Sequence, residues 1–198
     1  MKNYIKYSFD WLVALIMLLF FFPILIVPVS IIIKLTSPGP IIFKQLRVGQ
    51  NKKNFYLYKF RTMHKDAPAE IPKDLLDNPN HWITPFGKFL RRTSIDEIPQ
   101  LINIIKGEMS FIGPRPALYN QIILIQERDK YKINSLRPGL SGIAQINGRD
   151  SISIETKVNF DRLYISKQSF FFDLYIMIIS IKKIFKDNDL IEGKKDNN

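Results

Sequence analysis

The sequence contains no cysteine and only two histidines, His64 and His81. The absence of cysteine excludes disulfide bonds, cysteine-based zinc sites and a cysteine nucleophile. Two histidines are too few for the histidine-rich clusters that hold zinc or other transition metals. A catalytic centre in this chain must therefore be built from carboxylates, hydroxyls and basic side chains, and we assign no role to either histidine.

Acidic residues are missing from a long part of the N-terminal region, because none lies between Asp10 and Asp66. Within this gap, residues 11–33 carry no charge and are almost entirely apolar. A helix of that length, at about 1.5 Å per residue, reaches roughly 35 Å, enough to cross a hydrocarbon core of about 30 Å. The stretch therefore predicts a membrane helix. A cleaved signal peptide is disfavoured, because the apolar run is too long and no small-x-small cleavage site follows it.

Two prolines interrupt this stretch, Pro23 in its middle and Pro28 closer to its end. Each removes a backbone donor and pushes against the preceding turn, which predicts a break near Pro23. Basic residues lie on both sides of the stretch, and basic flanks favour the cytoplasmic side of a membrane. We therefore expect a re-entrant hairpin that enters the bilayer and returns, with a kinked single span as the alternative.

The charge balance restricts the partners of the chain. The net charge is +11 over 198 residues, of which 46% are hydrophobic. Such a chain suits nucleic acid, acidic lipid or phosphate-bearing substrates, and the membrane stretch favours the last two. The length fits a membrane element plus one compact domain. We expect an anchoring helix over residues 1–36, a cytoplasmic domain over residues 37–186 and a loose polar tail over residues 187–198.

The residue pattern predicts an α+β fold in which helices dominate, with a small sheet and amphipathic helices at the membrane interface. Residues 1–9 are expected to form an amphipathic lead-in, and residues 41–43 and 55–60 short strands. Thr84 followed by Pro85 predicts the start of a helix that ends near Arg92. The remaining segments divide into further expected helices over residues 95–106, 117–134, 151–167 and 170–185, and expected loops over residues 37–40, 67–80, 113–116, 137–142 and 147–149. The last helix fits either a core position or the membrane interface, apolar face down.

Asp96 and Glu97 carry the strongest chemical signal. The structural interpretation is a helix start, because Ser94 and Glu97 have the spacing of a capping box. The functional interpretation uses the same position, since a helix N-terminus favours ionised carboxylates and binds phosphate. A carboxylate there can attack phosphorus and form an acyl phosphate, while its neighbour helps to hold Mg²⁺. The spacing alone leaves both interpretations open.

Basic residues in turns supply candidates for phosphate binding, because arginine grips phosphate with a planar fork. Arg91 lies about one turn before Asp96, and Arg115 lies between two prolines that restrict the backbone around it. Arg137 and Arg149 stand next to glycine-containing turns. Each of these side chains either contacts a phosphate or braces its own loop.

Lys59 and Arg61 lie in a basic aromatic segment, residues 58–63. The charge pattern alone favours a strand that faces solvent or lipid headgroups. We nevertheless include both residues among the phosphate-binding candidates.

In combination these segments resemble a known family. The resemblance rests on the N-terminal apolar helix with its central proline, followed by residues 58–63, 93–101, 107–116 and 137–149, in that order. This set resembles the bacterial sugar transferases, specifically the small monotopic polyprenol-phosphate phosphoglycosyl transferases. The resemblance implies an enzyme on the cytoplasmic face of the bacterial inner membrane. Such an enzyme transfers a sugar-1-phosphate from a UDP-sugar to undecaprenyl phosphate, releases UMP and starts the assembly of a glycoconjugate.

The resemblance also implies roles for residues. Asp96 corresponds to the nucleophile, Glu97 assists with Mg²⁺, and Arg91 and Arg115 lie near this pair and the phosphates. The family has a Ser-Pro pair at its helix break, whereas this chain has Phe22 before its proline. Nucleic acid is not an implied partner, and neither the sugar, the glycan nor the oligomeric state follows from the sequence.

Two alternatives compete with this interpretation. A membrane-anchored basic module that binds nucleic acid or acidic lipid explains the charge but leaves Asp96 and Glu97 without a role. A direct transfer, in which the lipid phosphate attacks the donor itself, leaves Asp96 only a metal ligand.

Overall fold

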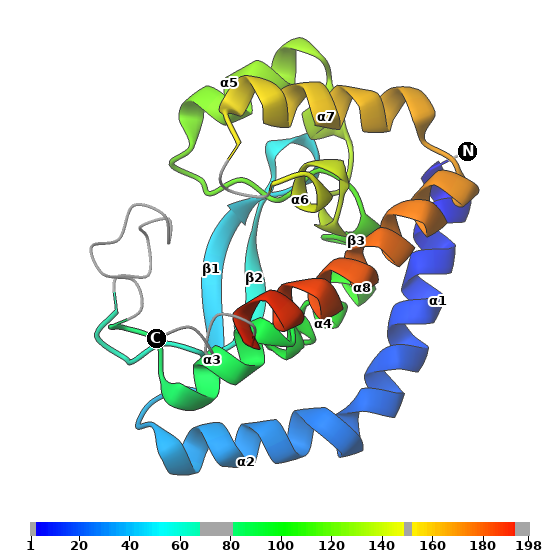
Figure 1. The fold of residues 1–198 in the computed structure, drawn as a ribbon. Helices are drawn as coiled ribbons and strands as arrows, with labels where there is room; N and C mark the ends of the chain where they lie inside the picture. The colour runs from blue at the N-terminus through cyan, green and yellow to red at the C-terminus, as the bar shows by residue number, and fades with distance from the viewer. Residues whose placement is uncertain (1–2, 68–80, 149–151, 193–198) are drawn as a thin grey trace.

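The computed structural model describes residues 3–67, 81–148 and 152–192, with side chains up to residue 184. Helices dominate the described chain, and two small two-stranded sheets lie among them (Figure 1). The structure thus confirms the predicted helix-rich α+β class. The predicted loop over residues 67–80 lies outside the described residues except for its first residue, and so does Arg149.

The N-terminal helix is continuous but bent. It consists of α1 (Asn3–Phe21), a π-helical turn (Phe22–Ile26) that contains Pro23, and α2 (Val27–Thr36). Figure 1 shows α1 and α2 running in clearly different directions from this turn. Ser30 Oγ donates to the carbonyl of Ile26 at 2.6 Å, a contact that often accompanies helix bending. The bend therefore coincides with a proline, a π-helical turn and a serine back-bond.

By length and composition, Asn3–Thr36 is the one helix among the described residues that can cross a membrane, and only 11% of its most apolar window is buried. From Asn3 onward, the expected amphipathic lead-in over residues 1–9 forms the first turns of α1 itself. The helix is thus suited to anchoring the protein in a membrane.

A β-hairpin follows the anchor. Strands β1 (Ile42–Val48) and β2 (Asn54–Phe60) pair antiparallel along their whole length, with Ile42 opposite Phe60. The predicted first strand, residues 41–43, is too short. The second half of β1 contains polar residues, so an apolar pattern does not reveal it as a strand. Pairing with β2 still satisfies the backbone hydrogen bonds of these residues.

The central segment carries α3 (Pro85–Arg92), a 3-10 turn (Ile95–Glu97) and α4 (Gln100–Ile105). The predicted start of α3 is confirmed, because Thr84 Oγ1 accepts a hydrogen bond from the Gly87 amide at 2.9 Å. The single helix predicted over residues 95–106 is wrong in its first part, since Pro99 separates the 3-10 turn from α4. Gly107 ends this segment with a φ of +76°, which only glycine adopts easily.

A second sheet was not predicted. Strands β3 (Ser110–Ile112) and β4 (Gly139–Ser141) pair in parallel, so the loop predicted over residues 137–142 is wrong there. Each strand is only three residues long, too short to show an alternating pattern. A Cβ atom at Gly139 would collide with the backbone of Gly113, so glycine permits this close approach.

The C-terminal half contains short and long helices. These are α5 (Ile122–Lys130), a 3-10 turn (Ile133–Ser135), α6 (Ile143–Ile146), α7 (Ile154–Lys167) and α8 (Phe170–Glu192). The helix predicted over residues 117–134 is therefore shorter than expected. The predicted loose tail is wrong for residues 187–192, because α8 continues through them.

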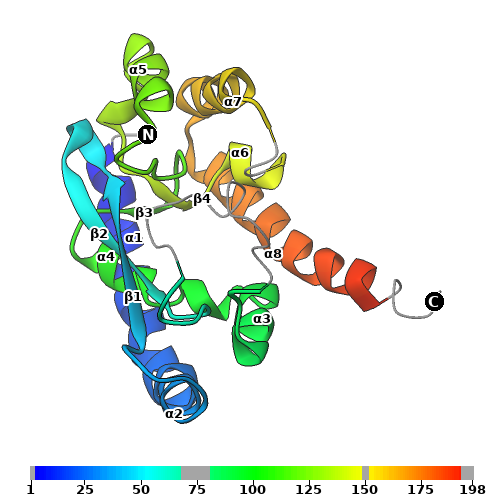
Figure 2. The same cartoon turned by 90° about the vertical axis from the view of Figure 1, so that its left-hand side faces the viewer.

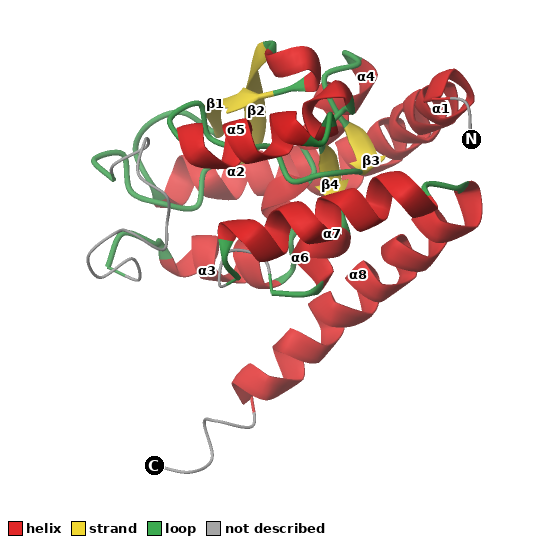
Figure 3. Cartoon of the chain, turned by 90° about the horizontal axis from the view of Figure 1, so that it is seen from above, coloured by secondary structure: helices red, strands yellow, loops and turns green. Residues whose placement is uncertain are grey.

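The main hydrophobic core unites the anchor with the rest of the protein. Ala14 on α1, Leu101 on α4, Met109 before β3 and Ile176 on α8 are all almost completely buried in one cluster. Helix α8 also has an exposed apolar side, where Phe171 is 80% exposed. One side of α8 thus belongs to the core, while its C-terminal end extends beyond the body (Figures 2 and 3).

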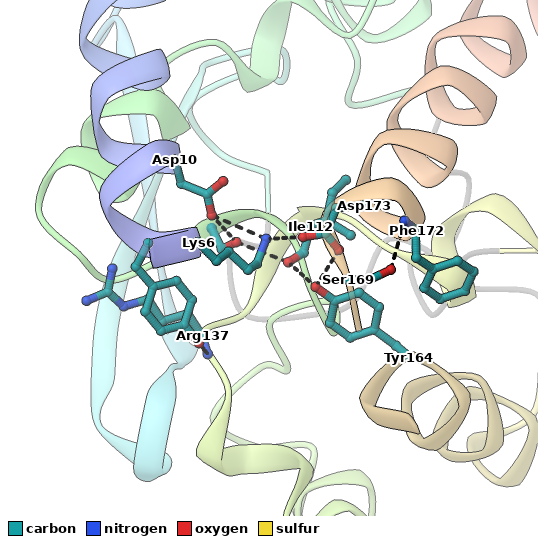
Figure 4. A network of polar contacts seen from close by, with 10 residues as sticks. Lys6, Asp10, Ile112, Arg137, Tyr164, Ser169, Phe172 and Asp173 are labelled. Atoms are coloured by element: carbon teal, nitrogen blue, oxygen red, sulfur yellow. Dashed lines mark hydrogen bonds and ion pairs between the residues drawn. The ribbon is translucent and has the colours of Figure 1, made fainter. Parts of the chain in front are cut away.

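A buried polar network fixes the first turns of α1 to the body (Figure 4). Lys6 Nζ lies 2.7 Å from Asp173 Oδ2 on α8 and 3.3 Å from Asp10 Oδ2. Ser110 Oγ donates to Asp10 at 2.5 Å, and Tyr164 donates to Asp173 at 2.8 Å. Burial, and then the neighbouring Asp173 charge, raises the pKa of Tyr164, which therefore stays protonated. Four separate elements meet at this network.

Candidate active site

Asp96 and Glu97 lie in the 3-10 turn between α3 and α4. Ser94, just before the turn, adopts a left-handed conformation with a φ of 57°, and its side chain caps no backbone amide. The capping-box interpretation is therefore wrong. Ser94 instead turns the chain sharply after α3, so that the two carboxylates face the end of β2.

Lys59 is the direct partner of Glu97. Its Nζ atom lies 2.7 Å from Glu97 Oε1, and each side chain is 21% exposed. Lys59, near the end of β2, thus projects toward the carboxylate pair. The expected strand facing solvent or lipid headgroups does not describe Lys59, because its half-buried side chain lies at the candidate site and pairs with Glu97.

Asp96 is the more buried of the two carboxylates, with 7% of its surface exposed. Burial raises its pKa to about 6, Lys59 and Arg91 lower it, and Glu97 raises it further. A single short turn does not offset the cost of burial, so the pKa of Asp96 lies above its ordinary value, but the carboxylate is still mostly ionised at about pH 7. Asp96 is therefore a carboxylate that titrates close to neutral pH, a feature that often marks functional sites.

Arg91, on the last turn of α3, borders the same site. Its Nε atom donates to Thr62 Oγ1 at 2.7 Å, which anchors the guanidinium. Burial lowers the pKa of Arg91, and the Asp96 charge raises it. The structure thus brings together Asp96, Glu97, Lys59 and Arg91.

Arg61 occupies a different place. Its guanidinium donates to the backbone carbonyls of Ser37 and Pro38 at 2.7 and 2.6 Å, and the residue is 7% exposed. It therefore braces the chain where α2 ends. Carbonyls at a helix end need donors from elsewhere, and the Pro-Gly-Pro segment that follows supplies few of them.

Arg115 lies in the stiff turn over residues 113–116, and its carbonyl oxygen accepts a hydrogen bond from Arg128 Nη1 at 2.8 Å. Arg128 in turn contacts Asp161 through Nε and Nη2, at 2.9 and 2.7 Å from the same carboxylate oxygen. This buried pair braces the turn from behind. Neither residue was among the candidates, because a charged pair split between two helices leaves no local pattern in the sequence.

Arg137 is not brought to the carboxylate pair. Its guanidinium lies over the ring of Tyr7 on α1, 4.1 Å from the ring centre, and against Gly107. Asp96 precedes α4 whereas Gly107 follows it, so the two arginine-bearing regions lie toward opposite ends of that helix.

Comparison with known proteins adds the decisive observation. The family model described as "Bacterial sugar transferase" matches residues 1–187 of the chain. The protein belongs to the bacterial sugar transferase family. The resemblance inferred from the ordered motifs is thereby confirmed, and the chain is a transferase.

Individual relatives agree. This transferase is 38% identical over 182 residues to a protein described as uncharacterized sugar transferase EpsL of Bacillus subtilis, covering 91% of this chain and 87% of EpsL. It is 35% identical over 193 residues to the exopolysaccharide production protein ExoY of Rhizobium meliloti, covering 90% and 84%. A UDP-glucose:undecaprenyl-phosphate glucose-1-phosphate transferase of Escherichia coli is 36% identical over 193 residues, which cover 91% of this chain and 40% of that protein.

The donor set of the sugar transferase site fits Mg²⁺. No group of three or more acidic or histidine side chains that could hold a metal occurs among the described residues. Mg²⁺ does not need one, because it commonly binds one or two carboxylates, keeps several waters and takes its remaining ligands from substrate phosphates. Asp96 and Glu97 are the side chains suited to this role.

The raised pKa of Asp96 predicts an acid limb in the pH profile. The sequence predicts Asp96 as the nucleophile, and a carboxylate attacks only when it is ionised, so we expect kcat/KM to fall about tenfold per pH unit once the pH drops below about 6. Lys59→Gln should move this limb to higher pH, because the Lys59 charge lowers the pKa of Asp96. Initial rates measured across the pH range for both proteins test this. An acid limb that stays in place in Lys59→Gln would contradict the assignment to Asp96.

Proposed function

We propose that this sugar transferase moves a sugar-1-phosphate from a UDP-sugar to undecaprenyl phosphate and releases UMP. The observation that carries the proposal is Asp96, a buried carboxylate with a pKa near 6, beside the Lys59–Glu97 ion pair and Arg91. Relatives named for undecaprenyl-phosphate sugar transfer support the choice of substrates. The reaction would begin the assembly of a bacterial polysaccharide or other glycan.

The first step is a displacement at the sugar-bearing β-phosphorus. An ionised Asp96 oxygen attacks this phosphorus, and the bond to the bridging oxygen breaks, so that its electron pair leaves with UMP. A sugar-phosphoryl aspartate remains on the enzyme. Arg91, close to Asp96 and fixed by Thr62, is placed to stabilise the charge on the transferring group.

The second step regenerates the carboxylate. A phosphate oxygen of the lipid attacks the same phosphorus, and the bond between phosphorus and the Asp96 oxygen breaks. Lys59 holds Glu97 in place throughout. Mg²⁺, when bound by Asp96, Glu97 and the substrate phosphates, supplies charge neutralisation for the diphosphate.

Two features of the fold support a re-entrant anchor. The start of α1 is fixed to the body through Lys6 and Asp10, and the end of α2 is fixed to it through Ser37 and the Arg61 guanidinium. Both ends of the anchor thus attach to one body, which a helix crossing the bilayer once would not permit. Because basic flanks favour the cytoplasmic side, we place the body on the cytoplasmic face of the membrane.

A panel of UDP-sugars tests the proposal. Purified enzyme with Mg²⁺ and undecaprenyl phosphate should release UMP from one sugar class, and Asp96→Asn should release none above background. The double-displacement route also predicts UMP release, up to about one equivalent per enzyme, without the lipid acceptor. UMP release that strictly requires the acceptor would instead support direct attack by the lipid phosphate. No release from any UDP-sugar would refute the proposed activity.

A further inference from the structure

A cavity of about 700 Å³ lies between the first turns of α1, the end of α4 and the turn of the β-hairpin. Its walls combine aromatic rings with cationic and small residues, chiefly Tyr4, Tyr7, Trp11, Lys106, Gly107 and Arg137. Among the described residues, none that lines the cavity is acidic. The cavity is thus suited to an anionic group attached to an apolar or amphipathic body.

Arg137 provides the main point of contact for an anion. Its guanidinium stacks on Tyr7, and its backbone amide donates to the Tyr7 hydroxyl at 3.2 Å, so the side chain is held in place. Its Nε atom is buried and has no hydrogen-bond partner among the residues that the structure describes. A buried donor without an acceptor costs about 1–3 kcal/mol, and a water or ion near the group is one of the explanations for such a donor in a native protein.

Lys106 adds a second positive charge at the cavity wall. Its Nζ atom lies 3.1 Å from the Tyr58 hydroxyl and 3.7 Å from Glu108, and 48% of its side chain is exposed. Gly107, between Lys106 and the guanidinium, has no side chain to cover Arg137, and a Cβ there would touch the guanidinium at 3.4 Å. A phosphate can therefore approach the guanidinium over Gly107.

The location indicates which kind of anion reaches the cavity. Tyr4 is 86% exposed and precedes the uncharged stretch of α1, and Trp11, the first residue of that stretch, is 44% exposed. Tyrosine and tryptophan collect at the depth of lipid headgroups, where a ring meets both the apolar and the polar layer. The cavity therefore lies at the end of α1 where the uncharged stretch begins.

The same location separates the cavity from the proposed chemistry. Helix α4 lies between Asp96 and Gly107, and its six residues alone span about 9 Å. A phosphate held by Arg137 is thus not in contact with Asp96, as an attacking lipid phosphate would have to be.

We propose that this cavity binds the phosphodiester headgroup of a bilayer phospholipid, with Arg137 as its main ligand and Lys106 as a second. The bound lipid would fix the depth and orientation of α1 in the membrane. This role is independent of the proposed transfer reaction, and either can fail without the other.

Fluorescence of Trp11 offers a direct test. The chain has two tryptophans, so Trp82→Phe leaves Trp11, in the cavity wall, as the only reporter. In this background, full-length protein in neutral detergent is titrated with a short-chain phosphatidylglycerol. We expect a saturable change in Trp11 fluorescence that a phosphate-free diacylglycerol does not produce.

Arg137→Gln should weaken binding about tenfold, as expected for loss of a charge-assisted phosphate contact. Lys130→Gln, an exposed charge change on α5, should leave binding unchanged.

A second variant covers the case in which Arg137→Gln fails to fold. Ser8 is exposed and lines the cavity, so Ser8→Phe should fill the cavity and weaken lipid binding without removing a buried contact. Its KM for undecaprenyl phosphate in detergent should equal that of the parent. The proposal is overturned if diacylglycerol binds as well as phosphatidylglycerol, or if both cavity variants bind normally. It is also overturned if Ser8→Phe raises the KM for undecaprenyl phosphate, because the cavity would then belong to the acceptor.

Discussion

Asp96→Asn should lower the rate of sugar-phosphate transfer by about three orders of magnitude or more, as removal of a nucleophile does in other enzymes with covalent intermediates. Asparagine keeps the size of the side chain but offers a neutral amide that does not attack phosphorus. The measurement is the initial rate of UMP release at saturating UDP-sugar and undecaprenyl phosphate. Asp129→Asn, which changes an exposed carboxylate on α5 paired with Lys52, serves as the control and should keep full activity.

The same substitution should stabilise the folded protein at alkaline pH. A pKa raised from 3.8 to about 6 means that folding disfavours the ionised form of Asp96, and this penalty is fully present above about pH 6 and absent below about pH 4. Asparagine resembles the protonated acid and removes the penalty. The shift corresponds to about 3 kcal/mol as an upper value, because the group interacts with its charged neighbours.

Urea unfolding in detergent at about pH 8 and about pH 4 tests the sign of this effect. The stability gain of Asp96→Asn should be present at the higher pH and vanish at the lower one. Asp129→Asn should show no gain, since its hydrogen bond with Lys52 lowers the pKa of Asp129. A variant that is inactive but less stable than wild type at both pH values would show that Asp96 is a structural residue.

Lys6→Met should destabilise the protein by about 3–5 kcal/mol, the usual result of removing one partner from a buried ion pair. Lys6 is 4% exposed and is the cation that faces both Asp10 and Asp173. Methionine fills a similar volume but leaves two carboxylates facing each other without a counter-charge. The free energy of unfolding, measured by circular dichroism during urea unfolding in detergent, gives the effect directly.

A matched control separates burial from charge. Lys130 forms an ion pair with Glu127 at 2.6 Å on the exposed side of α5, so Lys130→Met should cost less than about 1 kcal/mol. Adding Asp173→Asn to Lys6→Met should recover part of the loss, because it removes one of the two uncompensated charges. Equal effects of Lys6→Met and Lys130→Met would contradict the account of the network.

The elements that could be predicted from sequence are those with a strong local signal. The helix start at Thr84 depends on one hydroxyl and one proline, and both act within a single turn. The parallel pair β3–β4 could not be predicted, because it joins segments far apart in the chain through glycine contacts. The split between the 3-10 turn and α4 could not be predicted, because the capping-box spacing of Ser94 and Glu97 indicates the start of one continuous helix.

In the candidate site, too, residues with a local sequence signal could be predicted and residues brought together by the fold could not. Asp96 and Glu97 could be found because their order and surrounding motif are local, whereas their neighbours depend on the fold. Lys59 reaches Glu97 only because β2 ends beside the 3-10 turn, while Arg61, two residues later, turns away to the carbonyls after α2. Charge and spacing alone do not distinguish these two residues.

The buried charged residues in apolar surroundings are the feature that sequence reasoning predicted least well. Lys6 and Asp10 lie four residues apart at the start of α1, which is a weak signal for a pair on one helix face. Asp173 lies within an otherwise apolar run. A single acidic residue in such a run indicates a buried carboxylate, which needs a cationic partner. That partner lies 167 residues away in the sequence, a distance over which local patterns carry no information.

Transient bonding of Asp96 to phosphorus is tested most directly by intact-protein mass spectrometry. Enzyme exposed to its UDP-sugar and Mg²⁺ without lipid acceptor should gain the mass of one sugar phosphate, and peptide mapping should place the group on Asp96. Addition of undecaprenyl phosphate should then remove the adduct. An enzyme that turns over fully yet never carries this mass, or carries it on another residue, would contradict the account.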